Sequence, residues 1–147
     1  MTIQERLIEE MKLAMKAKDA LRLGTIRMAR TAIKNAEIEA REGLAEDAVI
    51  RVLSTLVKQR REAAEAYRDS RPELAEKEEL ELAVLQEFLP QPLSEDELHS
   101  LVDAAITELG ATSMKEMGAV MKQVTAQTVG RADGKLVSNL VRQKLGS

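Results

Sequence analysis

A short proline-containing segment, residues 88–94, constrains the fold of this chain more than any other stretch of its sequence. It holds Pro90 and Pro92, two of only three prolines in the chain. Proline lacks a backbone N–H and disfavours the helical conformation of the residue before it, so neither proline fits inside a continuing helix. One helix must therefore end just before Pro90. Ser94 stands three residues before Glu97, the spacing of a capping box, which predicts that a new helix begins there.

The composition favours helices on both sides of this segment. The chain has 147 residues, of which 44% are hydrophobic and only 1% aromatic, and it is rich in the helix formers Ala, Leu, Glu, Lys and Arg. Apolar residues recur at helical spacing along most of it. We therefore predict an all-α fold with an N-terminal helical domain of about four helices at residues 1–89, a proline-rich hinge at 90–94 and a small three-helix C-terminal domain at 95–147.

Charge and cysteine content narrow the classes of function. The formal net charge is −3, so any contact with nucleic acid must come from a local basic patch. Cysteine is absent, which excludes disulfides and thiolate metal sites. No apolar run approaches the roughly 20 residues that cross a bilayer, so we expect no membrane partner. Glu5, Glu9 and Glu10 distinguish the amphipathic N-terminus from acid-poor transit peptides. We expect a cytoplasmic protein.

Residues 20–36 contain several basic side chains and no acidic one, although acids outnumber bases in the whole chain. The basic residues are Arg22, Arg27, Arg30 and Lys34. On a helix the last three fall within about 60° of one another, which makes a continuous basic face. The next predicted helix carries a second basic cluster, formed by Lys58, Arg60 and Arg61. Two interpretations are open: a solvated flank whose arginines pair with acids on neighbouring helices, or a surface that binds a polyanion such as RNA.

The C-terminal region offers two further candidate surfaces. Met114, Met117 and Met121 repeat at helical spacing and either fill gaps in a small core or form an adaptable contact for another protein. Arg131 and Lys135 flank the predicted start of the last helix, whose free N–H groups attract anions. We expect both basic residues to be able to touch an RNA backbone.

The sequence shows no arrangement typical of an active site. The acids between residues 73 and 87 lack the Asp-x-Asp or Glu-x-x-His spacing that gathers metal ligands, so a solvated acidic face is expected there. His99 is the only histidine and has no nucleophile or acid partner by motif. We expect no catalytic residue, no metal and no cofactor.

Three segments resemble a known family in their order and spacing. They are RMARTAIKNAEIE at 27–39, EFLPQPLSEDEL at 87–98, and residues 110–145 with TSMKEMGAVM and GRADGKLVSNLVRQKL. Together they are similar to YqeY-type proteins of the GatB/YqeY family, over nearly the whole chain. The resemblance implies a helical N-terminal domain followed by a small helical C-terminal domain. That second domain is similar to the tail of the B subunit of the glutamine-dependent tRNA amidotransferase, which helps to engage tRNA.

The resemblance implies a binding role and no active site. In this chain the role would fall on Lys122, Arg131, Lys135 and Arg142. The family carries a carbon–nitrogen ligase label with glutamine as amido-N-donor, but the chain resembles neither the catalytic body of that subunit nor its amidase partner. We therefore expect a non-catalytic, tRNA-contacting accessory module. The alternative is a helical adaptor that binds a protein of the translation machinery through its Met-rich C-terminal module.

Overall fold

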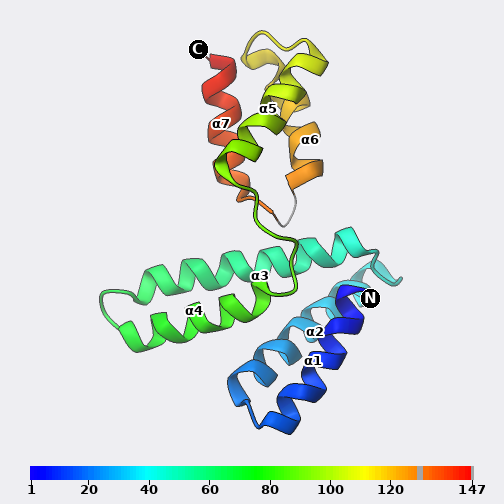
Figure 1. Cartoon of the computed structure of the whole chain (residues 1–147), viewed down its shortest axis with the longest axis vertical. Coiled ribbons are helices and arrows are strands. Elements are labelled where there is room, and N and C mark those ends of the chain that lie inside the picture. Colours follow the sequence, from blue (N-terminus) through cyan, green and yellow to red (C-terminus); the bar gives the residue numbers. More distant parts are fainter. Residues whose placement is uncertain (129–130, 147) are drawn as a thin grey trace. The chain divides into compact units, whose positions relative to one another are not determined.

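The structure, a computed structural model, describes residues 1–128 and 131–146. Over these residues the chain forms seven α-helices and one turn of 3₁₀ helix, with no strand (Figure 1). The predicted all-α class is confirmed for this part of the chain. None of its helices is both long enough and apolar enough to span a bilayer.

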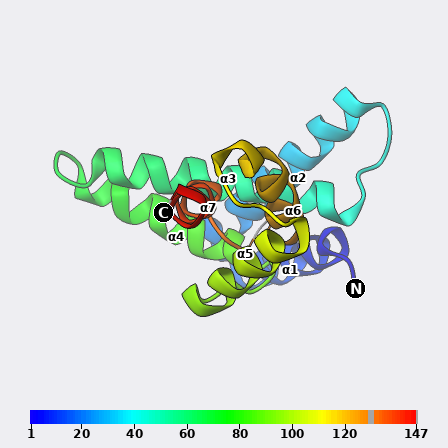
Figure 2. The ribbon, with the colours of Figure 1, turned by 90° about the horizontal axis from the view of Figure 1, so that it is seen from above.

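The first four helices build the N-terminal part of the chain. They are α1 (Ile3–Ala17), α2 (Ala20–Ala40), α3 (Glu46–Tyr67) and α4 (Pro72–Gln86). Helices α1 and α2 form one antiparallel hairpin and α3 and α4 form another, and the two views show α3 and α4 side by side (Figures 1 and 2). One continuous core joins the hairpins, built from Ile3, Leu7, Ile26, Ala29, Ile33, Val49, Leu53, Val57, Val84, Leu85 and Phe88.

Side-chain caps set where these helices begin. The hydroxyl of Thr2 accepts the Glu5 N–H at 3.2 Å and the carboxylate of Asp19 accepts the Arg22 N–H at 3.1 Å. Each bond satisfies a backbone donor that the first turn of a helix leaves free. Pro72 begins α4, where its missing N–H costs nothing. These three starts agree with the sequence pattern.

Three helices end with the same backbone motif, and the sequence signalled only one of them. Lys18, Arg41 and Gly110 all have a left-handed backbone, with φ between 57° and 63°. At each one the N–H groups of that residue and the next fold back onto carbonyls of the last helical turn, which satisfies them. Gly43, the first glycine after α2 and the residue at which the sequence pattern predicts its end, is therefore not its cap. Arg41 ends the helix two residues earlier, and a left-handed arginine is hard to foresee from sequence.

The segment that follows α4 packs against Arg6 of α1 and is hydrogen-bonded to it. Phe88 is only 1% exposed, and the guanidinium of Arg6 lies 5.2 Å from the centre of its ring. Arg6 also donates a hydrogen bond of 2.8 Å to the carbonyl of Glu87. Because the last turn of a helix leaves its carbonyls without partners, this bond caps α4 from a distant part of the sequence.

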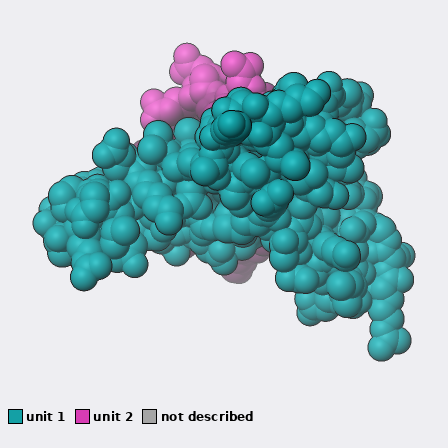
Figure 3. Space-filling model, turned by 90° about the horizontal axis from the view of Figure 1, so that it is seen from below, with its two compact units in different colours: residues 1–90 teal, residues 91–147 magenta. Residues whose placement is uncertain are grey.

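The chain divides into two compact units, residues 1–90 and 91–147 (Figure 3). The second unit contains α5 (Glu95–Leu109), the 3₁₀ turn η1 (Met114–Glu116), α6 (Met117–Thr128) and α7 (Gly134–Gly146). Ser94 caps α5 as predicted. Ser113 and Glu116 form a capping box, and the helix that it opens begins as a 3₁₀ turn. Gly130, which the sequence places in the turn before α7, lies outside the described residues.

A separate core holds the second unit together. It consists of Leu98, Val102, Ala105, Ala111, Val120, Val124, Val137, Leu140, Val141 and Leu145. Apart from Ala111, which lies between α5 and η1, these side chains come from all three helices of the unit. Their removal from water, at roughly 25 cal/mol per Å², is the main force that holds the helices together. The backbone N–H of Leu93 donates to the carbonyl of Arg131 at 2.8 Å, which ties the start of the unit to the turn before α7.

Candidate nucleic-acid interface

The outer face of α2 carries exposed basic side chains. Arg27, Arg30 and Lys34 all lie there, beside the stripe of buried residues that includes Ile26 and Ile33. Arg30 donates a hydrogen bond of 3.3 Å to the thioether sulfur of Met11, which is a weak acceptor and leaves the positive charge uncompensated. In the described part of the chain, Arg27 and Lys34 form no hydrogen bond or ion pair through their side chains. Their charges face solvent.

Arg41 adds a further exposed base directly after the last residue of α2. Its left-handed backbone takes its side chain out of the helical repeat, so helical spacing does not give its direction. Counting the bases beyond Ala36 would have found it. We call the four exposed residues Arg27, Arg30, Lys34 and Arg41 the outer basic face of α2.

Arg22 lies on the same helix but has a different environment. Its guanidinium is 3.0 Å from the carboxylate of Glu10 in α1 and 2.7 Å from that of Glu87 after α4. The hydrogen bond that Arg22 donates to Glu87 raises the pKa of Arg22 above its ordinary value, and the one it donates to Glu10 adds to this, against the lowering effect of burial. Arg22 therefore joins three segments of the first unit, and its charge is compensated.

Arg60 is compensated in the same way at the junction of α2, α3 and α4. Its Nε lies 3.4 Å from the carboxylate of Glu78 and 3.3 Å from that of Glu81. All three side chains are largely shielded from solvent. Its Nη2 contacts the sulfur of Met28, which brings the basic cluster of α3 next to α2. Lys58 and Arg61, the other members of that cluster, are exposed and have no ion pair among the described residues.

The second unit separates its charges between helices. Residues 117–146 contain one acid, Asp133, whereas α5 carries most of the acids of the unit. The bases of the same stretch are Lys122, Arg131, Lys135, Arg142 and Lys144. Lys144 is 2.7 Å from Asp103 of α5. Lys122, Lys135 and Arg142 are exposed, so the α6–α7 side of the unit is locally positive despite the acidic whole.

Arg131 has a structural as well as an electrostatic role. Its Nε donates a hydrogen bond of 3.0 Å to the carbonyl of Gln91, and its Nη2 lies 3.9 Å from Glu97. Asp133 accepts the Lys135 N–H at 3.0 Å and so occupies part of the anion-attracting start of α7. The structure therefore places Arg131 and Lys135 in the same turn, as expected. The Arg131 guanidinium already binds Gln91 and Glu97, and Asp133 already accepts one of the N–H groups at the start of α7.

The three methionines of the adaptor interpretation have different environments. Met117 and Met121 pack against the core of the second unit. Met114 is 43% exposed in the η1 turn. Of the three, Met114 is therefore the one whose side chain is exposed to a partner.

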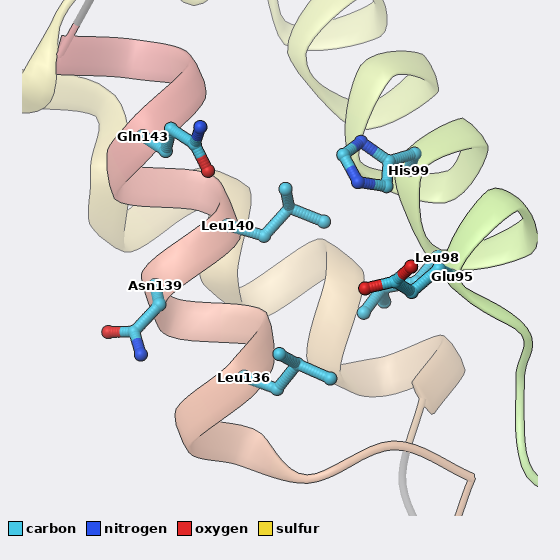
Figure 4. Close-up of a pocket in the computed structure, with 7 residues that line it drawn as sticks. All are labelled: Glu95, Leu98, His99, Leu136, Asn139, Leu140 and Gln143. Atoms are coloured by element: carbon cyan, nitrogen blue, oxygen red, sulfur yellow. The ribbon is translucent and has the colours of Figure 1, made fainter.

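The acidic and histidine residues show no catalytic arrangement within the described residues. No three of the His, Asp and Glu side chains there are grouped to hold a metal ion. His99 is exposed and lies at the rim of a small pocket between α5 and α7 (Figure 4). The exposed basic side chains of α2, α6 and α7 can instead bind anions through their guanidinium and ammonium groups.

Proteins named "Altered inheritance of mitochondria protein 41, mitochondrial" are similar to the chain. That of Pyrenophora tritici-repentis is 30% identical over 146 residues, covering 97% of this chain and 80% of that protein. That of Eremothecium gossypii is 35% identical over 130 residues, with 85% and 71% covered. That of Lachancea thermotolerans is 39% identical over 107 residues, with 70% of this chain and 57% of that protein covered. The chain thus spans little more than half of the Lachancea protein.

These relatives correct one expectation. We expected a cytoplasmic protein. The comparison with these relatives contradicts that expectation, because relatives that match most of the chain are mitochondrial by name. The expectation rested on the lack of cysteine and on the acids near the N-terminus. Neither feature distinguishes the cytosol from the interior of an organelle.

A second kind of relative is a subunit of an enzyme. It is a glutamyl-tRNA(Gln) amidotransferase subunit from Thermococcus gammatolerans, 39% identical over 88 residues, which is 56% of this chain and 14% of that protein. The family model described as "Yqey-like protein" matches residues 4–145. The family resemblance found in the sequence is therefore confirmed, and the chain belongs to the YqeY-like family.

Proposed function

We propose that this YqeY-like chain is a non-catalytic accessory module that contacts tRNA through its exposed basic side chains. The observation that carries the proposal is its 39% identity to part of an amidotransferase subunit named for glutamyl-tRNA(Gln). The matched part is only 14% of that subunit, so the proposal transfers a binding role and no ligase activity. The outer basic face of α2 and the exposed bases of α6 and α7 supply the charges that such a role requires.

The side chains available favour contact with the RNA backbone over reading of single bases. Tyr67 and Phe88 are the only aromatic residues, and Phe88 is buried in the core. Proteins that bind unpaired bases stack them on exposed aromatic rings, which this chain lacks in number. Guanidinium and ammonium groups instead bind phosphates, and folded RNA is recognised largely by shape and backbone. We therefore propose that the chain binds folded tRNA with strong dependence on salt.

The test compares tRNA binding by three proteins over a range of salt concentrations. The first is the unaltered chain, and the second carries Arg27→Glu, Arg30→Glu and Lys34→Glu. The third, a matched control, carries Lys12→Glu, Lys16→Glu and Lys77→Glu, which are exposed positions outside the basic face. Both variants have the same net charge, so any difference between them reports the location of the contact.

We expect the unaltered chain to bind a tRNA transcript with an affinity that falls steeply as salt rises. The substitutions on α2 should weaken binding by about 100-fold, because three phosphate contacts become repulsive. The control should weaken it much less. Equal losses in the two variants, or binding that is insensitive to salt, would contradict the proposal.

A protein-binding adaptor is the second candidate function. It is favoured by the exposure of two large apolar residues of the second unit, Met114 and Leu109, each 43% exposed. Met side chains adapt to varied partners. Under this alternative, a partner co-purifies after nuclease treatment and is lost with Met114→Glu while the fold is retained. Loss of the partner on nuclease treatment would favour the RNA-binding function.

A further inference from the structure

Two arginines of the first unit donate hydrogen bonds to methionine sulfurs. Arg30 of α2 reaches the sulfur of Met11 in α1, with its Nη1 at 3.3 Å, and Arg60 of α3 contacts the sulfur of Met28 in α2. Arg60 is also held by two carboxylates of α4. For Arg30, the sulfur is the only side-chain partner among the described residues. The chemical state of that sulfur therefore bears directly on one member of the outer basic face of α2.

Met11 lies at the edge of the core of the first unit. Its side chain is partly buried and packs against that core. Its sulfur contacts a guanidinium group that is itself exposed, so a small polar oxidant that reaches Arg30 can also reach this sulfur. Met15, on the same helix, is 49% exposed, but its sulfur has no arginine partner in the described structure. The arginine contact distinguishes Met11 from this more exposed methionine.

We propose that Met11 is a site of oxidation by hydrogen peroxide and that its sulfoxide binds Arg30 in competition with phosphate groups. In this step the O–O bond of the peroxide breaks and one oxygen forms a bond to the Met11 sulfur, which loses two electrons to it. The other oxygen leaves as water with both protons of the peroxide. The product is a polar sulfoxide, whose oxygen accepts a hydrogen bond from Arg30 better than the thioether does.

The effect of this modification on tRNA binding rests on the proposed function. Arg30 keeps its positive charge after the oxidation, but a guanidinium group bound to the sulfoxide must break that bond before it donates in the same direction to a phosphate. Affinity for tRNA should therefore fall by about threefold, the effect of one hydrogen bond of modest net strength. Arg27 and Lys34, which have no sulfur partner in the described structure, should be unaffected.

The test measures the availability of Arg30 without tRNA. The full chain and its Met11→Leu variant are treated with hydrogen peroxide in parallel, and peptide mass spectrometry locates the sulfoxides. Leucine has nearly the volume of methionine and no sulfur, so the two proteins differ in the oxidation of this one residue. Phenylglyoxal, which modifies accessible guanidinium groups, then labels both proteins, with Arg27 as the internal reference. Circular dichroism follows the helical fold.

We expect oxidation to lower the labelling of Arg30 relative to Arg27 by about threefold in the unaltered chain and to leave it unchanged in Met11→Leu. A third protein, Met11→Gln, places an amide oxygen at the same position without any oxidation, and glutamine is a good helix former. Its Arg30 should be labelled less than that of Met11→Leu before any peroxide is added. Affinity for tRNA, measured on the same samples, should fall with the labelling of Arg30.

Equal labelling of Arg30 in the oxidised chain and the oxidised Met11→Leu variant would overturn the proposal. So would a Met11 that stays a thioether while Met15 is oxidised, or an oxidation that unfolds the chain. Protection of Arg30 with unchanged affinity for tRNA would refute the competition with phosphate. A chain that shows this protection but binds no tRNA in either state would contradict the proposed function and leave the modification site in place.

Discussion

Arg22 and Arg27 lie five residues apart on α2, and their environments are opposite. Arg22 is at the edge of the helix that faces α1 and the end of α4, where Glu10 and Glu87 bind it. Arg27 is exposed on the outer face and has no side-chain hydrogen bond or ion pair in the described structure. The comparison shows that the absence of acids within a helix does not make its cations available. The direction of each cation relative to the neighbouring helices decides whether it pairs with acids of the fold or is available to bind a ligand.

Arg60 and Arg61 repeat this contrast on α3. Arg60 is held between two carboxylates of α4, a cluster that has one more negative than positive charge. Arg61, the next residue, is exposed. A half-buried arginine of this kind cannot leave its partners for a phosphate without exposing them to each other. The two arginines inside the fold are therefore expected to govern stability, and those outside to govern binding.

The largest effect is expected from Arg60→Glu. This change places a third carboxylate beside Glu78 and Glu81 in a shielded site, and it should lower the free energy of unfolding by about 3 kcal/mol. Urea denaturation of the purified protein measures the loss. Arg61→Glu is the matched control and should change stability by less than about 0.5 kcal/mol. Equal losses of stability at the two positions would contradict the distinction between the shielded Arg60 and the exposed Arg61.

A smaller loss is expected from Arg22→Gln. The substitution removes two charge-assisted hydrogen bonds whose acceptors, Glu10 and Glu87, are partly exposed and regain water. The free energy of unfolding should fall by about 1 kcal/mol. Thermal unfolding measures it, beside Arg27→Gln, which should be neutral. If Arg27→Gln destabilised as much, Arg27 would have a structural role that its exposure does not suggest.

The second unit contains a milder version of the contrast, between Arg131 and Lys135. Arg131→Ala loses the bond to the Gln91 carbonyl and should cost about 1 kcal/mol of stability as well as some tRNA affinity. Lys135→Ala should lower tRNA affinity alone, because its ammonium group is exposed. Binding titrations and urea denaturation on the same two variants test both statements. A stability loss with Lys135→Ala would remove the distinction.

Much of the fold follows from the sequence, and the positions of the charges follow only in part. Ser94, Ser113 and Pro72 carry local signals, because a cap or a first-turn proline acts within four residues. The pairing of Arg60 depends on α4, which lies about twenty residues further along the chain. Helical periodicity predicts the face of its own helix on which each residue lies. It does not predict which faces of α3 and α4 pack against each other. The end of α2 at Arg41 escaped prediction for a different reason, since a left-handed arginine has no sequence signature.

The smallest effect expected is a pH dependence at Glu116. Its carboxylate accepts hydrogen bonds from the side chain and the N–H of Ser113, at 2.9 Å and 3.0 Å, and these bonds lower the pKa of Glu116. The ionised form is therefore favoured by folding. Its contribution to stability is complete above the ordinary glutamate pKa of 4.5 and is lost as the pH falls through the lowered value.

Glu116→Gln tests this by comparison with the unaltered chain. The variant should be slightly less stable near neutral pH, and the difference should vanish in acid, as followed by thermal unfolding at a series of pH values. A difference that grows as the pH falls would contradict the assignment.

The central claim is that the exposed cations of α2 contact tRNA. The reactivity of lysine side chains toward acetylation tests it most directly. Lys34 lies on the outer basic face, whereas Lys12 and Lys77 are also exposed but lie elsewhere in the first unit. Acetylation of the full chain with and without saturating tRNA, read by mass spectrometry, compares them in one sample. We expect tRNA to protect Lys34 and to leave Lys12 and Lys77 unchanged. Unprotected Lys34 in a chain that demonstrably binds tRNA would contradict the account.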